Sequence, residues 1–453
     1  MKLLRSLEAA LSTALLVDVA LAATAGKLSI LSMNVAGLPA ILNSNDVPGD
    51  KTTNAETIGS KFAEYDYDVI HVQEDFNYHA AIYRTDNHPF RTATSGGVPF
   101  GSGLNTLSKL DWVQFERVKW ATCSDASSSD CLTPKGFTFM RAAISAGAAD
   151  NTTAVYVDFY NLHADAGTES GDNVARQANI NQVASYIAAS SQGNAVLIYG
   201  DTNSRYSRAA DTAIRSLVAS TSGTSFGMRD AWVELQRGGV VPSEESLCAN
   251  PSSNYLCETV DKVFYRSSPL VTLKAETFQY VSSLFLQADG NVLSDHNPVS
   301  VNITWSSGPS LRQSAFWGGP HGTWFSDVSA LANVKKPKPS VLSFRGGARL
   351  DSVSLTLTDG TRLTHGGTGG SATSITLGAS EYWVEARLCQ GQRSGQTRNF
   401  YIQASTTSGR TLAAGTATQD CATFSAPSGW HIVGFLGQAG DELDQLAFVY
   451  APK

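Results

Sequence analysis

The sequence has few charged residues and no cluster of basic ones. Charged residues make up 16% of its 453 positions, and 33 Lys and Arg stand against 40 Asp and Glu, for a net charge of −7. Tight nucleic-acid binding usually needs a basic stripe, so this composition weakens that class of function without excluding a nuclease that turns over quickly. Beyond the N-terminus, no stretch is apolar enough to span a membrane.

The N-terminus has the pattern of a secretory signal peptide, which we place at residues 1–22. Lys2 and Arg5 precede a mostly apolar stretch, and Ala20-Leu21-Ala22 offers a small-residue cleavage site. Asp18 interrupts the apolar stretch, so an amphipathic helix is the alternative interpretation. The pattern predicts a secreted, extracellular protein.

The cysteines support an oxidising compartment. There are six, an even number, in three local couples, and four of them lie in polar loops, which makes buried free thiols the weaker alternative. We therefore predict the disulfides Cys123–Cys131, Cys248–Cys257 and Cys389–Cys421. In a eukaryotic secretory route, Asn151 and Asn302 would be glycosylation acceptors.

The length exceeds one ordinary core, so two domains are expected. Residues 27–305 alternate strand-like runs with helical patterns, which indicates a layered α/β sandwich. The helical patterns cover 53–65, 173–190 and 208–218.

A short run of small residues, 306–310, predicts a flexible linker. From 311 to 453 no convincing helix appears. Short alternating runs are broken there by Gly pairs, which favours an all-β domain.

Five apolar runs in the first region are bounded by polar side chains. One such strand end is common and usually means nothing, but five on one rim would form a hard-oxygen metal site beside two histidines. Such a site suits attack on a phosphate ester. The polar groups are Asn34, then Gln73 with Glu74, His163 with Asp165, Asp201 with Asn203, and Asp295 with His296.

Each of these residues can be given a role by chemical need. Glu74 is the expected direct ligand of Mg²⁺ or another divalent cation, with Asn34, Asp201 and Asn203 completing the ring directly or through water. His296 is the natural general base, and Asp295 tunes the metal or the imidazole. His163 donates to a phosphate oxygen as charge develops, and Asp261 orients a histidine. Taken singly, each motif is as readily an ordinary turn or a structural histidine.

The segments that carry these polar residues, taken in their order along the chain, resemble the endonuclease/exonuclease/phosphatase superfamily of metal-dependent phosphoesterases. The resemblance covers nearly all of 27–305 and implies a four-layer α/β sandwich, DNase I-like, with the roles given above. The matching segments are SMNVAGL, HVQED, GSGLNTL, NLHAD, GDTN and SDHNPV.

Within that superfamily, the Cys-bracketed segment CSDASSSDCLTPKGFTF is similar to secreted sphingomyelinases of the phospholipase C type. Those enzymes touch lipid with an aromatic-tipped hairpin before the last Ser-Asp-His, and Leu284-Phe285-Leu286 stands at a similar spacing. A strand packed in the core is the more favoured interpretation of that segment.

The second region resembles a jacalin-type lectin over 311–450, in GGPHGTWF, DGTRLTHGGTGG and GDELDQLAFVY among other segments. The resemblance implies a β-prism with a sugar loop at Gly440, Asp441, Glu442, Leu443 and Asp444. Asp444 would accept sugar hydroxyls, and Gly318 with Gly319 would form the facing wall. The alternative is that these are only tight turns.

The leading hypothesis is a secreted, Mg²⁺-dependent sphingomyelinase-type phosphodiesterase, directed to glycans by its lectin domain. A phospholipid is the favoured substrate, and contact with a membrane surface is left open. The alternatives are a secreted nuclease acting on nucleic acid, and a lectin whose first domain no longer catalyses.

Overall fold

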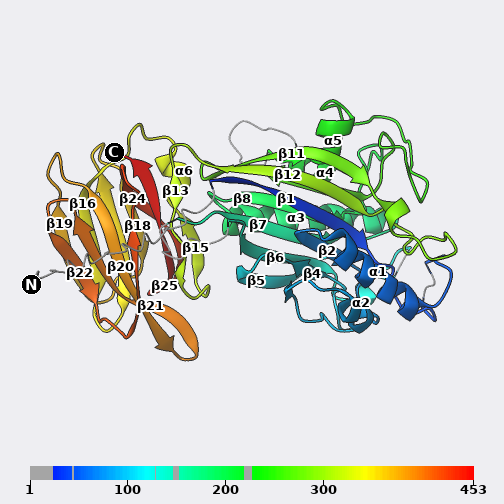
Figure 1. Cartoon of the computed structure of the whole chain (residues 1–453), viewed down its shortest axis with the longest axis horizontal. Coiled ribbons are helices and arrows are strands. Elements are labelled where there is room, and N and C mark those ends of the chain that lie inside the picture. Colours follow the sequence, from blue (N-terminus) through cyan, green and yellow to red (C-terminus); the bar gives the residue numbers. More distant parts are fainter. Residues whose placement is uncertain (1–23, 43–44, 128, 146–152, 219–226) are drawn as a thin grey trace, which may run out of the picture.

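The computed structural model describes residues 24–42, 45–127, 129–145, 153–218 and 227–453. The expected signal peptide and the acceptor Asn151 lie outside the described residues. Figure 1 shows two bodies joined end to end, a mixed α/β body and an all-β body that contains the C-terminus.

Two six-stranded sheets form the centre of the first body. The inner strands pack on both faces, as β1 illustrates: Ile30 packs between the sheets, whereas Leu31 packs toward the helices. In order across the sheet, the first contains β11 (Val271–Tyr280), β12 (Val299–Ser307), β1 (Ala25–Asn34), β2 (Val69–Gln73), β4 (Asn105–Ser108) and β3 (Phe90–Arg91). The second contains β5 (Trp112–Lys119), β6 (Gly136–Ala143), β7 (Tyr156–His163), β8 (Ala195–Asp201), β10 (Asp261–Arg266) and β9 (Arg229–Asp230).

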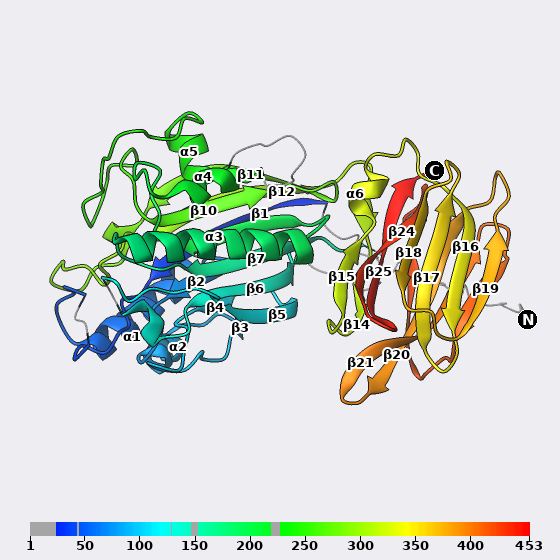
Figure 2. The same ribbon diagram turned by 180° about the vertical axis from the view of Figure 1, so that it is seen from behind.

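Helices cover the outer faces of both sheets and complete the four-layer sandwich predicted from the sequence (Figures 1 and 2). They are α1 (Lys51–Tyr65), α2 (His79–Thr85), α3 (Ser170–Ser190), α4 (Thr212–Val218) and α5 (Ala231–Gln236), with single 3₁₀ turns at Asp130–Leu132 and Ser282–Leu284. Asp50 caps α1 by accepting from the Thr53 amide at 2.8 Å.

Two of the three predicted helices match α1 and α3 closely, and the third begins later than expected. Residues 208–211 form a turn, because Arg208 Nε donates to Asp211 at 2.6 Å and the same carboxylate accepts from the Arg205 amide. The short helices α2 and α5 were not predicted. Both are shorter than the two turns or more that a periodic apolar pattern needs to be recognised.

The segment 284–286 is neither a core strand nor an aromatic-tipped hairpin. Leu284 ends a 3₁₀ turn, and Phe285 is buried with its ring centroid 5.8 Å from that of Phe62. Because α1 supplies an apolar surface beside it, this aromatic residue packs inward instead of reaching solvent.

The second body consists of three small antiparallel sheets around an aromatic core. Trp383 is fully buried, and its ring contacts those of Phe435 and Phe448. The strands are β13 (Arg312–Gln313), β14 (Trp317–Gly318), β15 (Thr323–Ser326), β16 (Pro339–Gly346), β17 (Leu350–Leu357), β18 (Arg362–Gly366), β19 (Ser371–Thr376), β20 (Trp383–Arg393), β21 (Gln396–Thr406), β22 (Thr411–Gly415), β23 (Asp420–Ser425), β24 (Trp430–Ala439) and β25 (Leu443–Pro452). One four-residue helix, α6 (Val328–Leu331), corrects the expectation of a region without helix.

The expected flexible linker is partly strand. Strand β12 runs through Ser307, and the Gly308 amide donates to the Leu270 carbonyl at 2.7 Å, so the chain leaves the first body as ordered backbone. Side chains also join the two bodies. The Arg141 guanidinium lies 3.7 Å from the centroid of the Trp324 ring, and Gln438 donates to Gln114 at 2.8 Å.

Candidate active site

The two sheets bring the predicted strand ends to one rim. Strands β1 and β2 are parallel, with Asn34 beside Gln73, and β7 and β8 are parallel, with His163 beside Asp201. Strand β10 runs antiparallel to β8 and places its first residue, Asp261, directly opposite Asp201. Parallel strands end on the same edge of a sheet, so within each sheet the register brings these strand ends together. We call Asn34, Glu74, His163, Asp201, Asp261, Asp295 and His296 the strand-end cluster.

Asn34 connects the two sheets within this cluster. Its Nδ2 lies 3.2 Å from Glu74 Oε1 and 3.3 Å from Asp201 Oδ2, and it approaches His296 Nε2 at 3.5 Å. The Asn34 side chain is fully buried, and its Oδ1 accepts from the Ala36 amide at 3.0 Å. The amide orientation is therefore fixed by the backbone that follows β1.

His296 is held by a carboxylate in the way expected of an oriented base. Its Nδ1 lies 2.8 Å from Asp261 Oδ2, and its Nε2 lies 3.8 Å from Asp201 Oδ2. Burial lowers the pKa of His296, but the carboxylates of Asp261 and Asp201 outweigh it and raise the pKa well above its usual range. With Nδ1 bonded to Asp261, the nitrogen directed at the cluster is Nε2.

His163 lies on the other side of Asp201. Its Nε2 is 3.4 Å from Asp201 Oδ2 and 3.2 Å from Lys135 Nζ, whereas its buried Nδ1 has no hydrogen-bond partner among the described residues. Burial and the Lys135 ammonium lower the pKa of His163 to about 3. The imidazole is therefore neutral at physiological pH, and as a neutral ring it can donate one N–H.

Glu74 and Asp295 bring two carboxylates to a common point. Asn45 Nδ2 lies 3.2 Å from Glu74 Oε2 and 3.4 Å from Asp295 Oδ2, so a single amide nitrogen bridges them. Burial raises the pKa of Glu74, as does the negative charge of Asp295, while Lys135 acts in the opposite direction. Hard oxygens around a point of excess negative charge fit a divalent cation.

A second grouping also has metal-binding geometry. Ligand atoms of Asp201, Asp261 and His296 all lie within 4.8 Å of one another. Because His296 Nδ1 already bonds to Asp261, we interpret these two residues as a carboxylate–histidine pair and not as metal ligands. A cation would then bind beside Glu74.

The remaining strand-end residues divide between the cluster and the core. Asn203 follows Asp201, whose Oδ1 accepts from its amide at 2.9 Å, and the Asn203 side chain donates to the Ala164 carbonyl. Gln73 does not face the cluster, because its Nε2 donates to Asn161 at 2.7 Å between the sheets. Asp165 accepts from the Ser124 amide, and burial raises its pKa to about 7.

Two residues of the site were not assigned a role from the sequence. Lys135 contacts His163 and forms an ion pair with Asp130. Asn45 bridges the carboxylates of Glu74 and Asp295. Asn45 comes from a loop, whereas Lys135 immediately precedes β6, whose antiparallel pairing with the end of β7 brings it beside His163. The left-handed backbone of Asn45, with φ of 57°, was not visible in the sequence, whereas Lys135 was visible only as part of the Cys-bracketed segment.

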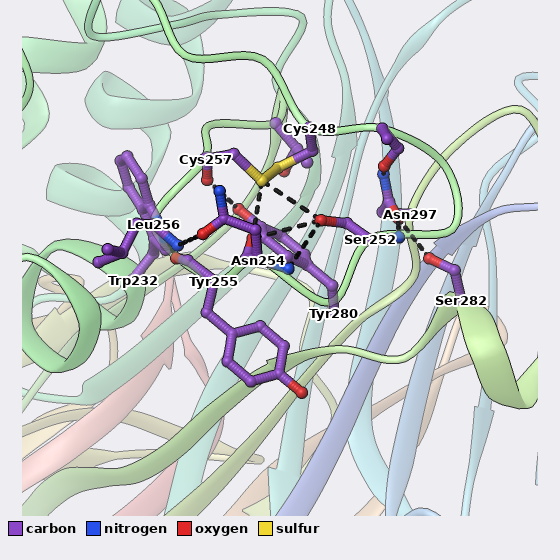
Figure 3. The surroundings of a disulfide bond; sticks show 12 residues. Trp232, Cys248, Ser252, Asn254, Tyr255, Leu256, Cys257, Tyr280, Ser282 and Asn297 are labelled. Atoms are coloured by element: carbon purple, nitrogen blue, oxygen red, sulfur yellow. Dashed lines mark hydrogen bonds between the residues drawn. A yellow bond between two sulfur atoms is a disulfide. The ribbon is translucent and has the colours of Figure 1, made fainter.

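The three disulfides pair as predicted, and all six cysteines are used. Figure 3 shows the Cys248–Cys257 bridge, whose loop rests on Asn297: the Ser252 amide donates to Asn297 Oδ1 at 3.0 Å. A cleft of about 400 Å³ opens beside this loop. Among its lining residues are Asn203, Leu247, Asp261, Asp295 and His296.

The predicted sugar-loop residues gather in the second body. A Cβ on Gly318 would lie 2.1 Å from the Asp444 carbonyl oxygen, and the Gly319 amide donates to that oxygen at 3.0 Å. The Gly440 amide donates to the Glu442 carbonyl, which closes the turn that carries Asp441. The two buried carboxylates carry arginine partners: Glu442 accepts from Arg349 and Arg393, and Asp444 accepts from Arg398.

Comparison with known proteins gives a match for each body. Residues 50–302 match the model of Endonuclease/Exonuclease/phosphatase family 2, and residues 314–449 match the model of the jacalin-like lectin domain. Sphingomyelinases of Mycobacterium bovis and Mycobacterium tuberculosis are 35% identical over 285 residues, or 61% of this chain and 53% of each relative. The chain thus spans about half the length of the curated relatives that it matches.

Solved structures resemble one body at a time. A D. rerio TDP2 humanised by 14 mutations is 19% identical, with a TM-score of 0.41, over 61% of this chain and 98% of its own. A mannose-binding jacalin-related lectin from Ananas comosus is 19% identical, with a TM-score of 0.28, over 32% of this chain and 99% of its own.

Proposed function

The chain belongs to endonuclease/exonuclease/phosphatase family 2, and we propose that it is a secreted phosphodiesterase that cleaves sphingomyelin or a related choline phospholipid. The observation that carries the hydrolytic part is Asn34, which contacts Glu74, Asp201 and His296 at once and so holds one polar centre across both sheets. The lipid part is supported by the mycobacterial sphingomyelinases and by the net charge of −7. The three disulfides support secretion.

In this proposal, His296 is the general base. Asp261 accepts from Nδ1, so Nε2 is the nitrogen that would take the proton from a water molecule in the cleft. The neighbouring carboxylates raise the pKa of His296, so this role requires a bound cation, whose positive charge would lower the pKa again. The water oxygen forms a bond to phosphorus as the bond from phosphorus to the lipid oxygen breaks, and the departing oxygen leaves as an alcohol after taking a proton from solvent. His296 then returns its proton to solvent. His163 and Lys135, 3.2 Å apart, donate to the phosphate oxygens as negative charge gathers on them.

The metal belongs to the same proposal. Glu74, Asp295 and Asn34 would hold Mg²⁺ or another divalent cation, with Asp201 and Asn203 near enough to act through water. The cation would supply charge neutralisation for the phosphate oxygens. We expect EDTA to abolish hydrolysis of a soluble phosphodiester and added Mg²⁺ to restore it. Glu74→Ala should lose most activity, while Glu276→Ala, an exposed carboxylate on β11, serves as the matched control.

A substrate panel tests the proposed class. Sphingomyelin, phosphatidylcholine, plasmid DNA and an inositol phosphate are each incubated with the full chain, with Mg²⁺ and with EDTA. We expect phosphocholine release from sphingomyelin. Plasmid cleavage without lipid hydrolysis would instead assign the chain as a nuclease, and salt would then weaken its binding steeply.

The jacalin-like lectin domain provides a second function, glycan binding. We propose that Asp444, Glu442, Asp441 and Gly440 face a shallow sugar site, with Gly318 and Gly319 as its wall. Such sites bind weakly one at a time and more strongly on a multivalent surface. The domain would therefore concentrate the enzyme on glycan-bearing membranes without taking part in the hydrolysis.

A further inference from the structure

The exposed large apolar side chains are distributed unevenly over the molecule. The described part of the chain has ten such residues, which all belong to 41–284, and the described residues of the lectin domain contribute none. Among them are Ile41, Phe100, Leu247 and Leu256, which are 93%, 84%, 50% and 54% exposed. We call these four residues the apolar rim, because their loops contact the segments that carry Glu74 and His296, on two sides of the strand-end cluster. Grouped exposed apolar residues mark contact surfaces more often than scattered ones do.

One side of the rim rests on the segment that follows β2. The Asp75 amide donates to the Gly103 carbonyl at 2.9 Å, and a Cβ on Gly37 would lie 2.3 Å from the Glu74 carbonyl oxygen. The loop that carries Phe100 is thus held beside Glu74 at Gly103, and the loop that carries Ile41 is held there at Gly37. Phe100 itself ends a turn, in which its amide donates to Gly97 at 2.8 Å.

The other side of the rim rests on the segment that contains His296. Asn250 Nδ2 donates to the Ser294 carbonyl at 2.8 Å, and Asn297 Nδ2 donates to the Ala249 carbonyl at 2.9 Å. The Cys248–Cys257 disulfide closes this loop, and Leu256 stands on it beside the bridge (Figure 3). Leu247, next to the bridge, is exposed and also lines the cleft.

The charges of the rim loops favour a neutral surface over an anionic one as the partner. Glu244 and Glu245 precede Leu247, Glu245 is the surface partner of Arg205, and the whole chain carries a net charge of −7. An anionic membrane attracts polybasic segments, and the described rim loops contain none. A zwitterionic lipid surface instead accepts apolar side chains without requiring positive charge.

We propose that the apolar rim docks the cleft onto a zwitterionic phospholipid surface, with Ile41 and Phe100 inserting on one side and Leu247 and Leu256 on the other. The inference rests on the proposed lipid phosphodiesterase function and names the surface that presents the substrate. Leu247 is exposed and also lines the cleft, so a lipid surface held by the rim would present its headgroups at the cleft.

Vesicle binding tests this directly. The full chain is incubated in EDTA with vesicles of phosphatidylcholine and sphingomyelin that carry no glycan, and bound protein is measured by flotation. Phe100→Ser and Leu256→Ser should each weaken binding about tenfold or more, as expected for one lost apolar insertion. Phe100→Trp should retain binding. Val174→Ser, which removes a 64% exposed apolar side chain from α3, is the matched control and should bind as the wild type does.

The outcomes separate the rim from the proposed function. Phe100→Ser and Leu256→Ser should hydrolyse a soluble phosphodiester at the wild-type rate, because neither residue touches the strand-end cluster. Wild-type and rim variants that bind vesicles equally, or binding only to vesicles rich in phosphatidylserine, would overturn the inference even if sphingomyelin is hydrolysed. Rim-dependent binding without lipid hydrolysis would leave the inference standing and refute the proposed substrate.

Discussion

At the scale of single residues, the site depends on side chains that are each fixed by a second contact. Asn34 is oriented by the Ala36 amide, and His296 is oriented by Asp261. His163 instead keeps a buried ring nitrogen without a partner among the described residues. An unpaired buried donor or acceptor costs free energy, so it is retained where a ligand can satisfy it.

Asp444 gives a prediction at this scale. Its carboxylate is buried and accepts from Arg398, so a sugar hydroxyl must share or replace that contact. In the full chain, Asp444→Asn should reduce retention on a glycan array at least about tenfold, the range for a hydrogen bond to a charged group. Asp441→Asn, a neighbouring exposed carboxylate, is the control and should reduce retention less.

Unchanged glycan retention in Asp444→Asn, together with a lower melting temperature, would show that Asp444 only shapes its turn. Hydrolysis of a soluble phosphodiester should be the same in both variants and in the wild type. The glycan site and the strand-end cluster lie in different bodies, so neither variant disturbs the catalytic residues.

At the scale of elements, β2 carries a titratable group into the space between the sheets. His71 is fully buried, and its ring stacks on Tyr199 with centroids 3.8 Å apart. Burial lowers the pKa of His71 to about 3. In the unfolded chain this histidine binds a proton near pH 6.5, whereas in the folded chain it stays neutral. The free energy of unfolding therefore falls as the pH falls below 6.5.

We expect this histidine alone to cost about 2 kcal/mol of unfolding free energy between pH 6.5 and 5. His71→Phe keeps an aromatic ring against Tyr199 and removes the titration. Denaturant unfolding of both proteins in EDTA at several pH values measures the difference, since all other groups titrate in both. Parallel pH profiles for the two proteins would contradict the assignment.

The elements also show what sequence patterns can and cannot predict. The polar strand ends were predictable because β2, β7 and β8 are buried along their whole length and are mostly apolar, so a polar group at the end of such a run is conspicuous. Asn45 was not, because loop geometry brings it to the cluster. Lys135 reaches His163 from the start of β6, a strand whose pairing with β7 the sequence pattern does not give. Phe285 was placed at a hairpin or strand by spacing, but contact with α1 determines its burial.

At the scale of the whole molecule, the strand-end cluster lies away from the joint between the bodies. Strand β1 pairs Ala25 with Ser306, close to the joint, and ends at Asn34 in the cluster (Figure 1). The apolar rim and the lectin domain therefore lie toward opposite ends of the first body. Within the described residues, no helix is both long and apolar enough to cross a membrane.

The joint itself gives a prediction about cooperativity. Arg141, paired with Asp158 at 2.8 Å, places its guanidinium on Trp324 of the second body. A desolvated contact of this kind contributes about 2 kcal/mol. We expect the wild type to unfold in one calorimetric transition and Trp324→Ala to show two, with activity on a soluble phosphodiester retained. Two well-separated transitions in the wild type would show that the bodies are energetically independent.

The central claim is that the strand ends of two sheets form one hydrolytic centre in which His296 acts as the base on a choline phospholipid. The most direct measurement is the rate of phosphocholine release from sphingomyelin dispersions with Mg²⁺, for the wild type and for His296→Ala. The claim predicts steady release by the wild type and a rate at least about a hundredfold lower for the variant. No release by the wild type, or equal rates for the two proteins, would contradict it.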